Sequence, residues 1–154
     1  MRTLVLVIFV ALMTALSPIS TAMAQQPSEE LLKELGIMVA QMQEVGARYD
    51  RKLVQLSGAI GTVNAGRTGS LNLGELAPDD YQVAVACANC GGLSAELLDA
   101  SGTVIEAKPM DFAATFFIFD VQDKGQRMVR ITPKDCAALS CEYGAVLFRD
   151  TPAQ

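Results

Sequence analysis

Seven short apolar runs, separated by turn residues, fill most of the chain after residue 66 and constrain its fold more than any other feature. They span residues 69–73, 81–87, 94–99, 104–108, 115–121, 128–132 and 142–149. Gly, Pro, Asp and Ser gather between them, as in APDD at 77–80 and DASG at 99–102. Runs of five to eight residues at this spacing are typical of antiparallel β-sandwiches. We therefore predict a mainly β fold, an antiparallel jelly roll or sandwich, over residues 65–154.

The alternation of side chains within these runs indicates which residues face the core. Tyr81, Val83 and Val85 alternate with smaller or polar residues, as expected for a half-buried strand. The run FFIF at 116–119 is apolar on both faces, so we expect that strand to be central or to be covered by a helix.

A different period precedes the sandwich. Its apolar residues are spaced four, three, four, three and four apart, which is an a/d heptad stripe: Leu31, Leu35, Met38, Met42, Val45 and Tyr49. The series continues through Leu53, Leu56, Ile60 and Val63 after one shift of phase. We predict a helix from about residue 28 to residue 57, reaching as far as 64, so that residues 25–64 form an amphipathic helix.

The apolar stripe of this helix has to be buried somewhere. It can pack on its own sandwich or on another protein chain, either a second copy or a different protein. We therefore take the six stripe residues as the predicted interaction face.

The first 24 residues have the form of a secretory signal peptide. Arg2 supplies a positive start, residues 4–16 are almost continuously apolar, and Ala22-Met23-Ala24 is a small-x-small cleavage site. Cleavage after Ala24 predicts a periplasmic or secreted protein. The apolar run is short for a membrane span, and nothing later is long enough, so no span is expected after cleavage.

Composition excludes several classes of function. The net charge is −5, and removal of Arg2 with the signal peptide takes it to −6, which argues against nucleic acid and anionic membranes as partners. The chain has no His, so triads, general bases and metal sites that need histidine are excluded. It has no Trp, and an aromatic platform for sugars would have to use Tyr49, Tyr81 or Tyr143.

The four cysteines, Cys87, Cys90, Cys136 and Cys141, admit three interpretations. Cys87 and Cys90 form a C-x-x-C, which is a redox couple when it starts a helix after a strand. All four together could make a thiolate zinc site. In an exported chain, structural disulfides are favoured. Of the three possible connectivities we predict the two local bridges, Cys87–Cys90 and Cys136–Cys141, while a crossed pairing would close longer loops and stabilise more.

Residues 68–150 resemble the bacterial pre-peptidase C-terminal domain, a small jelly-roll sandwich of secreted proteins, in its cysteine-bearing periplasmic subgroup. The residues that carry the resemblance are LAPDDY at 76–81, CGGLSAELLDASG at 90–102, GQRMVRI at 125–131, and the pair Cys136 and Cys141 followed by Tyr143-Gly144.

The resemblance implies a binding or accessory module without catalysis. Members of that family that hold calcium use carboxylates, and here Gly92 and Ser94 stand where the family has aspartates, while Arg127 replaces an aromatic residue. A calcium ion needs six to eight oxygen ligands. The carboxylates that remain are Asp79, Asp80, Asp99 and Asp111.

Three functions follow as hypotheses. The first is an exported, non-enzymatic binding or assembly module that contacts another protein through the helix or the sandwich, with no cofactor and no metal. The second is a sandwich that binds calcium, a glycan or a peptide. The third is a thiol–disulfide oxidoreductase that uses Cys87 and Cys90. The sequence indicates no particular small-molecule ligand.

Overall fold

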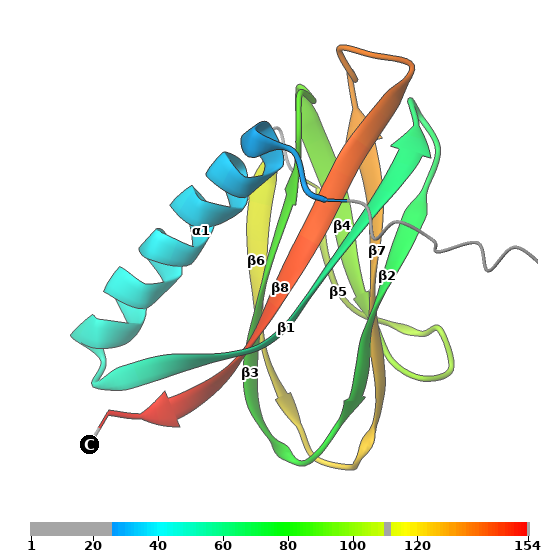
Figure 1. Ribbon diagram of the computed structural model, residues 1–154. Coiled ribbons are helices and arrows are strands. Elements are labelled where there is room, and N and C mark those ends of the chain that lie inside the picture. Colours follow the sequence, from blue (N-terminus) through cyan, green and yellow to red (C-terminus); the bar gives the residue numbers. More distant parts are fainter. Residues whose placement is uncertain (1–25, 110–111, 154) are drawn as a thin grey trace, which may run out of the picture.

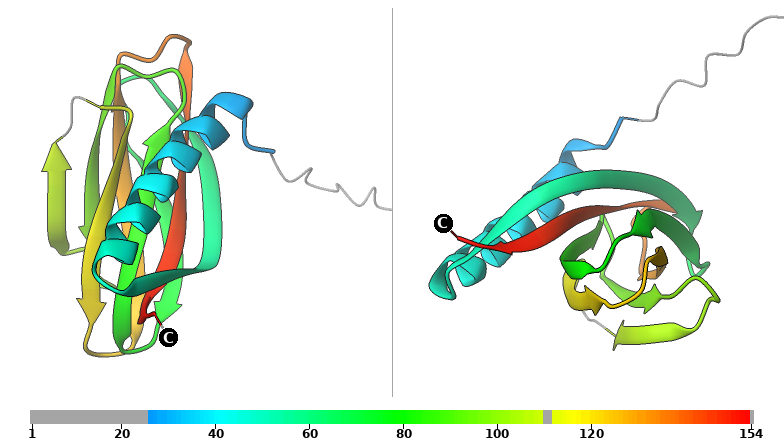
Figure 2. Two further views of the ribbon diagram at one scale, coloured as in Figure 1. Left: turned by 90° about the vertical axis from the view of Figure 1, so that its left-hand side faces the viewer. Right: turned by 90° about the horizontal axis from the view of Figure 1, so that it is seen from below.

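Two four-stranded antiparallel sheets pack face to face, and one helix lies on the outer face of the first sheet (Figures 1 and 2). This computed structural model describes residues 26–109 and 112–153, so the predicted signal peptide lies outside the described residues. Sheet A has the order β1-β8-β3-β6 and sheet B the order β2-β7-β4-β5, which is the strand order of a jelly roll. The predicted mainly β fold is confirmed.

The elements follow one another as one helix and eight strands. Their bounds are α1 Glu29–Arg48, β1 Arg51–Asn64, β2 Gly69–Leu76, β3 Asp79–Cys87, β4 Gly92–Leu98, β5 Val104–Pro109, β6 Ala114–Val121, β7 Gly125–Lys134 and β8 Ser140–Pro152. All seven predicted runs are strands, β2 to β8. The predicted inward side chains of β3 are buried between the sheets. The strand is not half-buried as predicted, because α1 covers Ala84 and Ala86 on its other face.

The strand that contains FFIF is not central. β6 is an edge strand of sheet A. Phe117 and Phe119 point into the core between the sheets, Phe116 is partly covered by α1, and Ile118 is exposed. Helix cover therefore explains only part of the apolar outer face of β6.

The predicted helix is too long. α1 begins after Ser28, whose hydroxyl accepts a hydrogen bond from the Leu31 amide, and it ends at Arg48. Asp50 then takes a left-handed conformation (φ 53°) that turns the chain into a strand. Residues 51–64, predicted as a continuation of the helix, form β1 instead.

A β-bulge explains why the pattern of β1 resembled a helix. β1 pairs with β8, and its register shifts between Gln55 and Ser57. The extra residue makes Leu53 and Ile60, seven positions apart, face the same side of the sheet, toward α1. In a regular strand an odd separation places two side chains on opposite faces, so the bulge converts a period of two into an apparent helical spacing.

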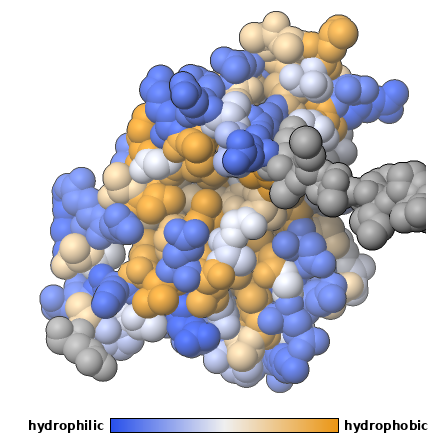
Figure 3. Space-filling view, viewed as in Figure 1, coloured by the Kyte–Doolittle hydropathy of each residue, from blue (hydrophilic) through white to orange (hydrophobic). Residues whose placement is uncertain are grey.

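α1 packs closely on sheet A because the sheet is lined with small residues there. Leu31, Leu35 and Met42 are buried in one cluster with Ala84 and Ala86, to which Ala88 and Phe148 also belong. Figure 3 shows the apolar surface that remains between the helix and the strands of this sheet. No helix within the described residues is long and apolar enough to cross a membrane.

Candidate functional site

Both disulfides lie at the same end of the sandwich. Cys87–Cys90 closes the connection between β3 and β4, and Cys136–Cys141 closes the connection between β7 and β8. The two local bridges predicted from the sequence are confirmed. Disulfides of this kind persist in oxidising compartments.

Backbone hydrogen bonds join the two disulfide loops to each other. The Gly91 amide donates to the Lys134 carbonyl over 3.0 Å, and the Ala137 amide donates to the Asn89 carbonyl over 2.9 Å. The Ala88 amide donates to the Glu142 carbonyl over 2.8 Å. The disulfides therefore lock one end of the fold.

The surroundings of Cys87–Cys90 differ from those of a thioredoxin-type couple. Cys87 is fully buried in the core, and the chain continues from Cys90 into strand β4. A helix N-terminus next to the thiol, which would lower its pKa, is not part of this arrangement.

Each described carboxylate named as a remaining calcium ligand already has a partner within the chain. Asp79 pairs with Arg149 at 3.3 Å and Asp80 with Arg51 at 3.0 Å. Asp99 accepts hydrogen bonds from the Ser101 hydroxyl and amide and from the Thr103 amide, and these bonds lower the pKa of its carboxyl. Asp111 lies outside the described residues. No three acidic or cysteine side chains of residues 26–109 and 112–153 converge on a possible metal position.

The tyrosines do not form a common platform for sugars. The Tyr81 hydroxyl donates to the Ala77 carbonyl over 2.9 Å inside the fold. Tyr143 is buried between the sheets, and burial raises the pKa of its phenol. Only Tyr49 is exposed, at 74% of its surface.

Most of the heptad stripe has its partner within the chain. Leu31, Leu35 and Met42 are buried against sheet A, and Met38 is partly buried beside them. Val45 and Tyr49, at the C-terminal end of α1, are exposed. A second molecule can therefore contact the helix through these last two positions or through residues outside the stripe.

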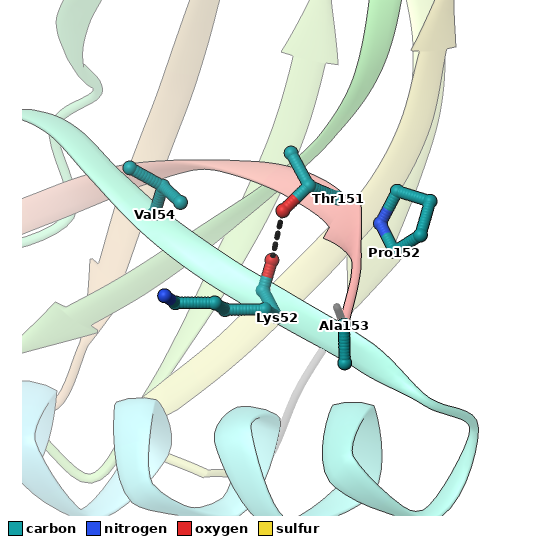
Figure 4. A pocket seen from close by; sticks show the side chains of 5 residues that line it. All are labelled: Lys52, Val54, Thr151, Pro152 and Ala153. Carbon is teal, nitrogen blue, oxygen red and sulfur yellow. Dashed lines mark hydrogen bonds between the residues drawn. The ribbon is translucent and has the colours of Figure 1, made fainter.

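A ledge projects from the sandwich beside the end of α1. It consists of the first half of β1 (residues 51–58), the last residues of β8 (149–152) and Ala153, and we call it the β1 ledge (Figures 1 and 2). A pocket of about 540 Å³ opens on it, lined by Lys52, Val54, Thr151, Pro152 and Ala153 (Figure 4). The Thr151 hydroxyl donates to the Lys52 carbonyl over 3.1 Å, which ties the two strands together.

A polar network anchors the base of the ledge. The Arg51 guanidinium donates to Asp150 over 2.8 Å and to Asp80 over 3.0 Å, and these carboxylates raise the pKa of Arg51. Gln82 donates to the second carboxylate oxygen of Asp150 over 2.8 Å. Asp150 is almost fully buried, so its charge is satisfied from two sides.

The electrostatic character of the ledge contrasts with the acidic chain. Residues 51–74 contain no Asp or Glu, and residues 53–63 contain no charged residue. None of the ion pairs formed among the described residues includes Lys52. The ledge is thus a neutral to basic surface with aliphatic side chains.

Two shallow grooves follow α1 on either side. One of about 330 Å³ lies toward β1 and is bordered by Leu32, Leu35, Ile60 and Val146. The other, of about 450 Å³, lies toward β6 and is bordered by Ile37, Met38, Phe112 and Phe116.

The features of this side of the molecule suit the binding of a polypeptide. They are the aliphatic walls of the grooves, the side chain of Lys52 and the free edge of β1. The ledge was not predicted from the sequence, because residues 51–64 were predicted as a continuation of the helix.

No protein-family model matches the chain, and no curated protein matches it. Among solved structures, the chain is similar to a protein from work on how "Bacillus endospore appendages form a novel family of disulfide-linked pili". The identity is 15%, the TM-score is 0.37, and the match covers 64% of this chain and 88% of that chain. At this level the similarity assigns no function.

Proposed function

We propose that the chain is a non-catalytic, protein-binding module of an oxidising, extracytoplasmic compartment. Its partner contacts the side of the molecule formed by α1 and the β1 ledge. The polar network of Asp150 anchors the base of the ledge, and the disulfide-locked end lies beside the start of α1, where the Ser28 amide donates to Glu142. The resemblance to pre-peptidase C-terminal domains supports the same type of function, because those domains are accessory modules.

The observation that carries the proposal is the distribution of exposed apolar side chains. Six of the eleven large apolar residues that are exposed in the described part of the chain fall between residues 32 and 56: Leu32, Ile37, Val45, Tyr49, Val54 and Leu56. Single exposed apolar residues are common, but a concentration on one side of a small domain marks an interaction surface. Figure 3 shows apolar surface along α1 on this side.

Site-specific photo-cross-linking in the source cell tests the proposal. A benzophenone amino acid is placed at Tyr49 or Leu32, and as a control at Ile105, which is similarly exposed (48%) but lies on β5 of sheet B. We expect cross-linked products of higher mass from positions 49 and 32 and none from position 105. Products from position 105 alone, or none from all three positions, would contradict the proposed surface.

The non-catalytic part of the proposal has its own test. We expect no reduction of insulin by the purified protein, because Cys87 is buried and no helix N-terminus activates it. Activity that disappears when Cys87 and Cys90 are both replaced by serine would show instead a thiol–disulfide oxidoreductase.

A further inference from the structure

The four strands at the sheet edges differ in how they are protected from pairing with another strand. On β6, Lys108 donates to the Phe116 carbonyl over 2.5 Å and covers the middle of the strand edge. β5 is short, carries Glu106 and Lys108, and ends at Pro109. These are the features by which natural sheets block their edges.

The edge strand β2 is interrupted. Its pairing with β7 shifts between Asn72 and Gly74, and Gly74 has a positive φ of 91°. The Asn72 side chain accepts the Gly74 amide hydrogen over 2.8 Å, so this amide is already used. A second strand would meet an irregular edge here.

The edge of β1 has the least protection. It is 14 residues long, contains no proline and no acidic residue, and pairs only with β8 among the described residues. Its bulge between Gln55 and Ser57 is not held by a side-chain hydrogen bond from any described residue like the one that Asn72 makes in β2. Toward its C-terminal end it approaches β2, since Gly61 and Gly69 both contact Tyr143, whereas residues 51–58 run away from sheet B (Figures 1 and 2). The backbone groups on the free side of residues 51–58 are therefore available to another strand.

The distribution of charge indicates that the strand added to this edge belongs to a second copy of the chain. Two copies of a chain with a net charge of −5 repel each other over most of their surfaces. They can approach with least repulsion where acidic residues are absent, which is residues 51–74. In an antiparallel pairing of residues 51–58 with themselves, Arg51 and Lys52 of one copy lie at the opposite end from those of the other, so no like charges meet.

We propose that two copies of the chain pair through the first halves of their β1 strands, antiparallel across a two-fold axis. This inference rests on the proposed function and names a second copy as the partner. The two A sheets join into one, and the exposed side chains of Val54 and Leu56 from both copies are covered. The groove beside Leu32 of each copy borders the joint. Lys108 blocks the opposite edge of sheet A, so the assembly closes at two copies instead of growing into a fibre.

The oligomeric state of the purified chain tests the inference. Sedimentation equilibrium over micromolar concentrations measures the mass of the wild type, of L56K and of I118K. Leu56 is exposed beside the proposed axis, whereas Ile118 is a comparably exposed apolar residue on the opposite edge of the same sheet. We expect a dimer for the wild type and for I118K, and a monomer for L56K, because each introduced lysine would place a charge opposite the apolar Leu53 of the other copy.

Amide hydrogen exchange provides a readout that does not depend on the folding of L56K. We expect residues 51–58 of the wild type to exchange more slowly as the protein concentration rises, while residues 114–121 of β6 stay unchanged. A wild type that is monomeric throughout, or protection on β6 and not on β1, would overturn the inference. Cross-links from Tyr49 or Leu32 to a different protein would still support the proposed function, so the two failures are distinguishable.

Discussion

Leu35 of α1 lies directly over Gly144 of β8: a Cβ atom added to Gly144 would sit 3.2 Å from Cδ1 of Leu35. It would also lie 3.2 Å from Cδ2 of Leu31 and 3.3 Å from the Ala59 carbonyl oxygen. The helix can rest on the sheet only because this position has no side chain. The substitution Gly144→Val should therefore force the helix away from sheet A and lower the free energy of unfolding by about 1–3 kcal/mol. Urea unfolding followed by circular dichroism measures the loss.

A second glycine provides the matched control. Gly36 lies in α1, and a Cβ atom added there would meet nothing within 4 Å. Gly36→Ala should raise the free energy of unfolding by about 1 kcal/mol, because alanine loses less conformational freedom in a helix. A destabilised Gly36→Ala together with a neutral Gly144→Val would show that the helix is not seated as described.

The two disulfides should contribute unequally to stability. Each closes a short loop, for which chain entropy accounts for about 2 kcal/mol. Each bridge has one buried cysteine, but Cys87 lies in the apolar core between the sheets, whereas Cys141 belongs to neither apolar cluster. Replacing the Cys87–Cys90 pair by serines therefore buries a hydroxyl among apolar side chains. We expect a larger drop in the free energy of unfolding for this double variant than for Cys136→Ser/Cys141→Ser. Equal losses would contradict the proposed effect of the apolar surroundings of Cys87.

Asp99 should give the protein an acid-sensitive contribution to stability. Its folded-state pKa is lowered from 3.8 by the hydrogen bonds from Ser101 and from Thr103. A lowered pKa stabilises the fold above the pKa of the unfolded chain, and this contribution disappears as pH falls through the folded value. NMR titration of the Asp99 carboxyl should give a midpoint below 3.8, and Ser101→Ala should move it back toward that value. An unchanged midpoint in Ser101→Ala would reject the role of that hydrogen bond.

Tyr143 should limit stability at alkaline pH. Burial raises the pKa of its phenol from 10.0, although a hydrogen bond from the Ser70 backbone acts in the opposite direction. For a raised pKa, the stabilising contribution is complete below the unfolded pKa and is lost as pH rises through the folded value. Tyr143→Phe should cost about 1 kcal/mol at neutral pH through the lost hydrogen bond and should remove part of the decline above pH 10. Tyr49→Phe is the control, since that side chain is exposed, and urea midpoints from neutral to alkaline pH measure both variants.

Strand positions and disulfide pairing were predictable because the signals are local. Turn residues separate the seven runs that became β2 to β8, and the alternation of Tyr81, Val83 and Val85 identified the core face of β3. Cys87 and Cys90, like Cys136 and Cys141, lie within one connection, so each pair can close without knowledge of the sheet register.

The β1 ledge was not predictable in the same way. Residues 51–64 have apolar spacing that suits a helix, and only pairing with β8, about 90 residues later in the chain, holds them as a strand. The bulge at Gln55 and Ser57 then removes the period of two by which a strand is identified. Lys52, the edge of β1 and the absence of acidic residues from 51–74 indicate an interaction surface only when residues 51–58 are known to form an edge strand.

Interactions between near neighbours in the chain are sufficient to specify an amphipathic helix that begins at Glu29, seven strands between turns, and two local disulfides. Contacts between distant segments set where the helix stops, bury its stripe on Ala84, Ala86 and Gly144, and leave β1 at the edge of sheet A. The two groups of features differ because the interactions behind them act over different distances along the chain. Propensity and capping act over a few residues, whereas strand pairing and helix docking join segments that lie more than 100 residues apart.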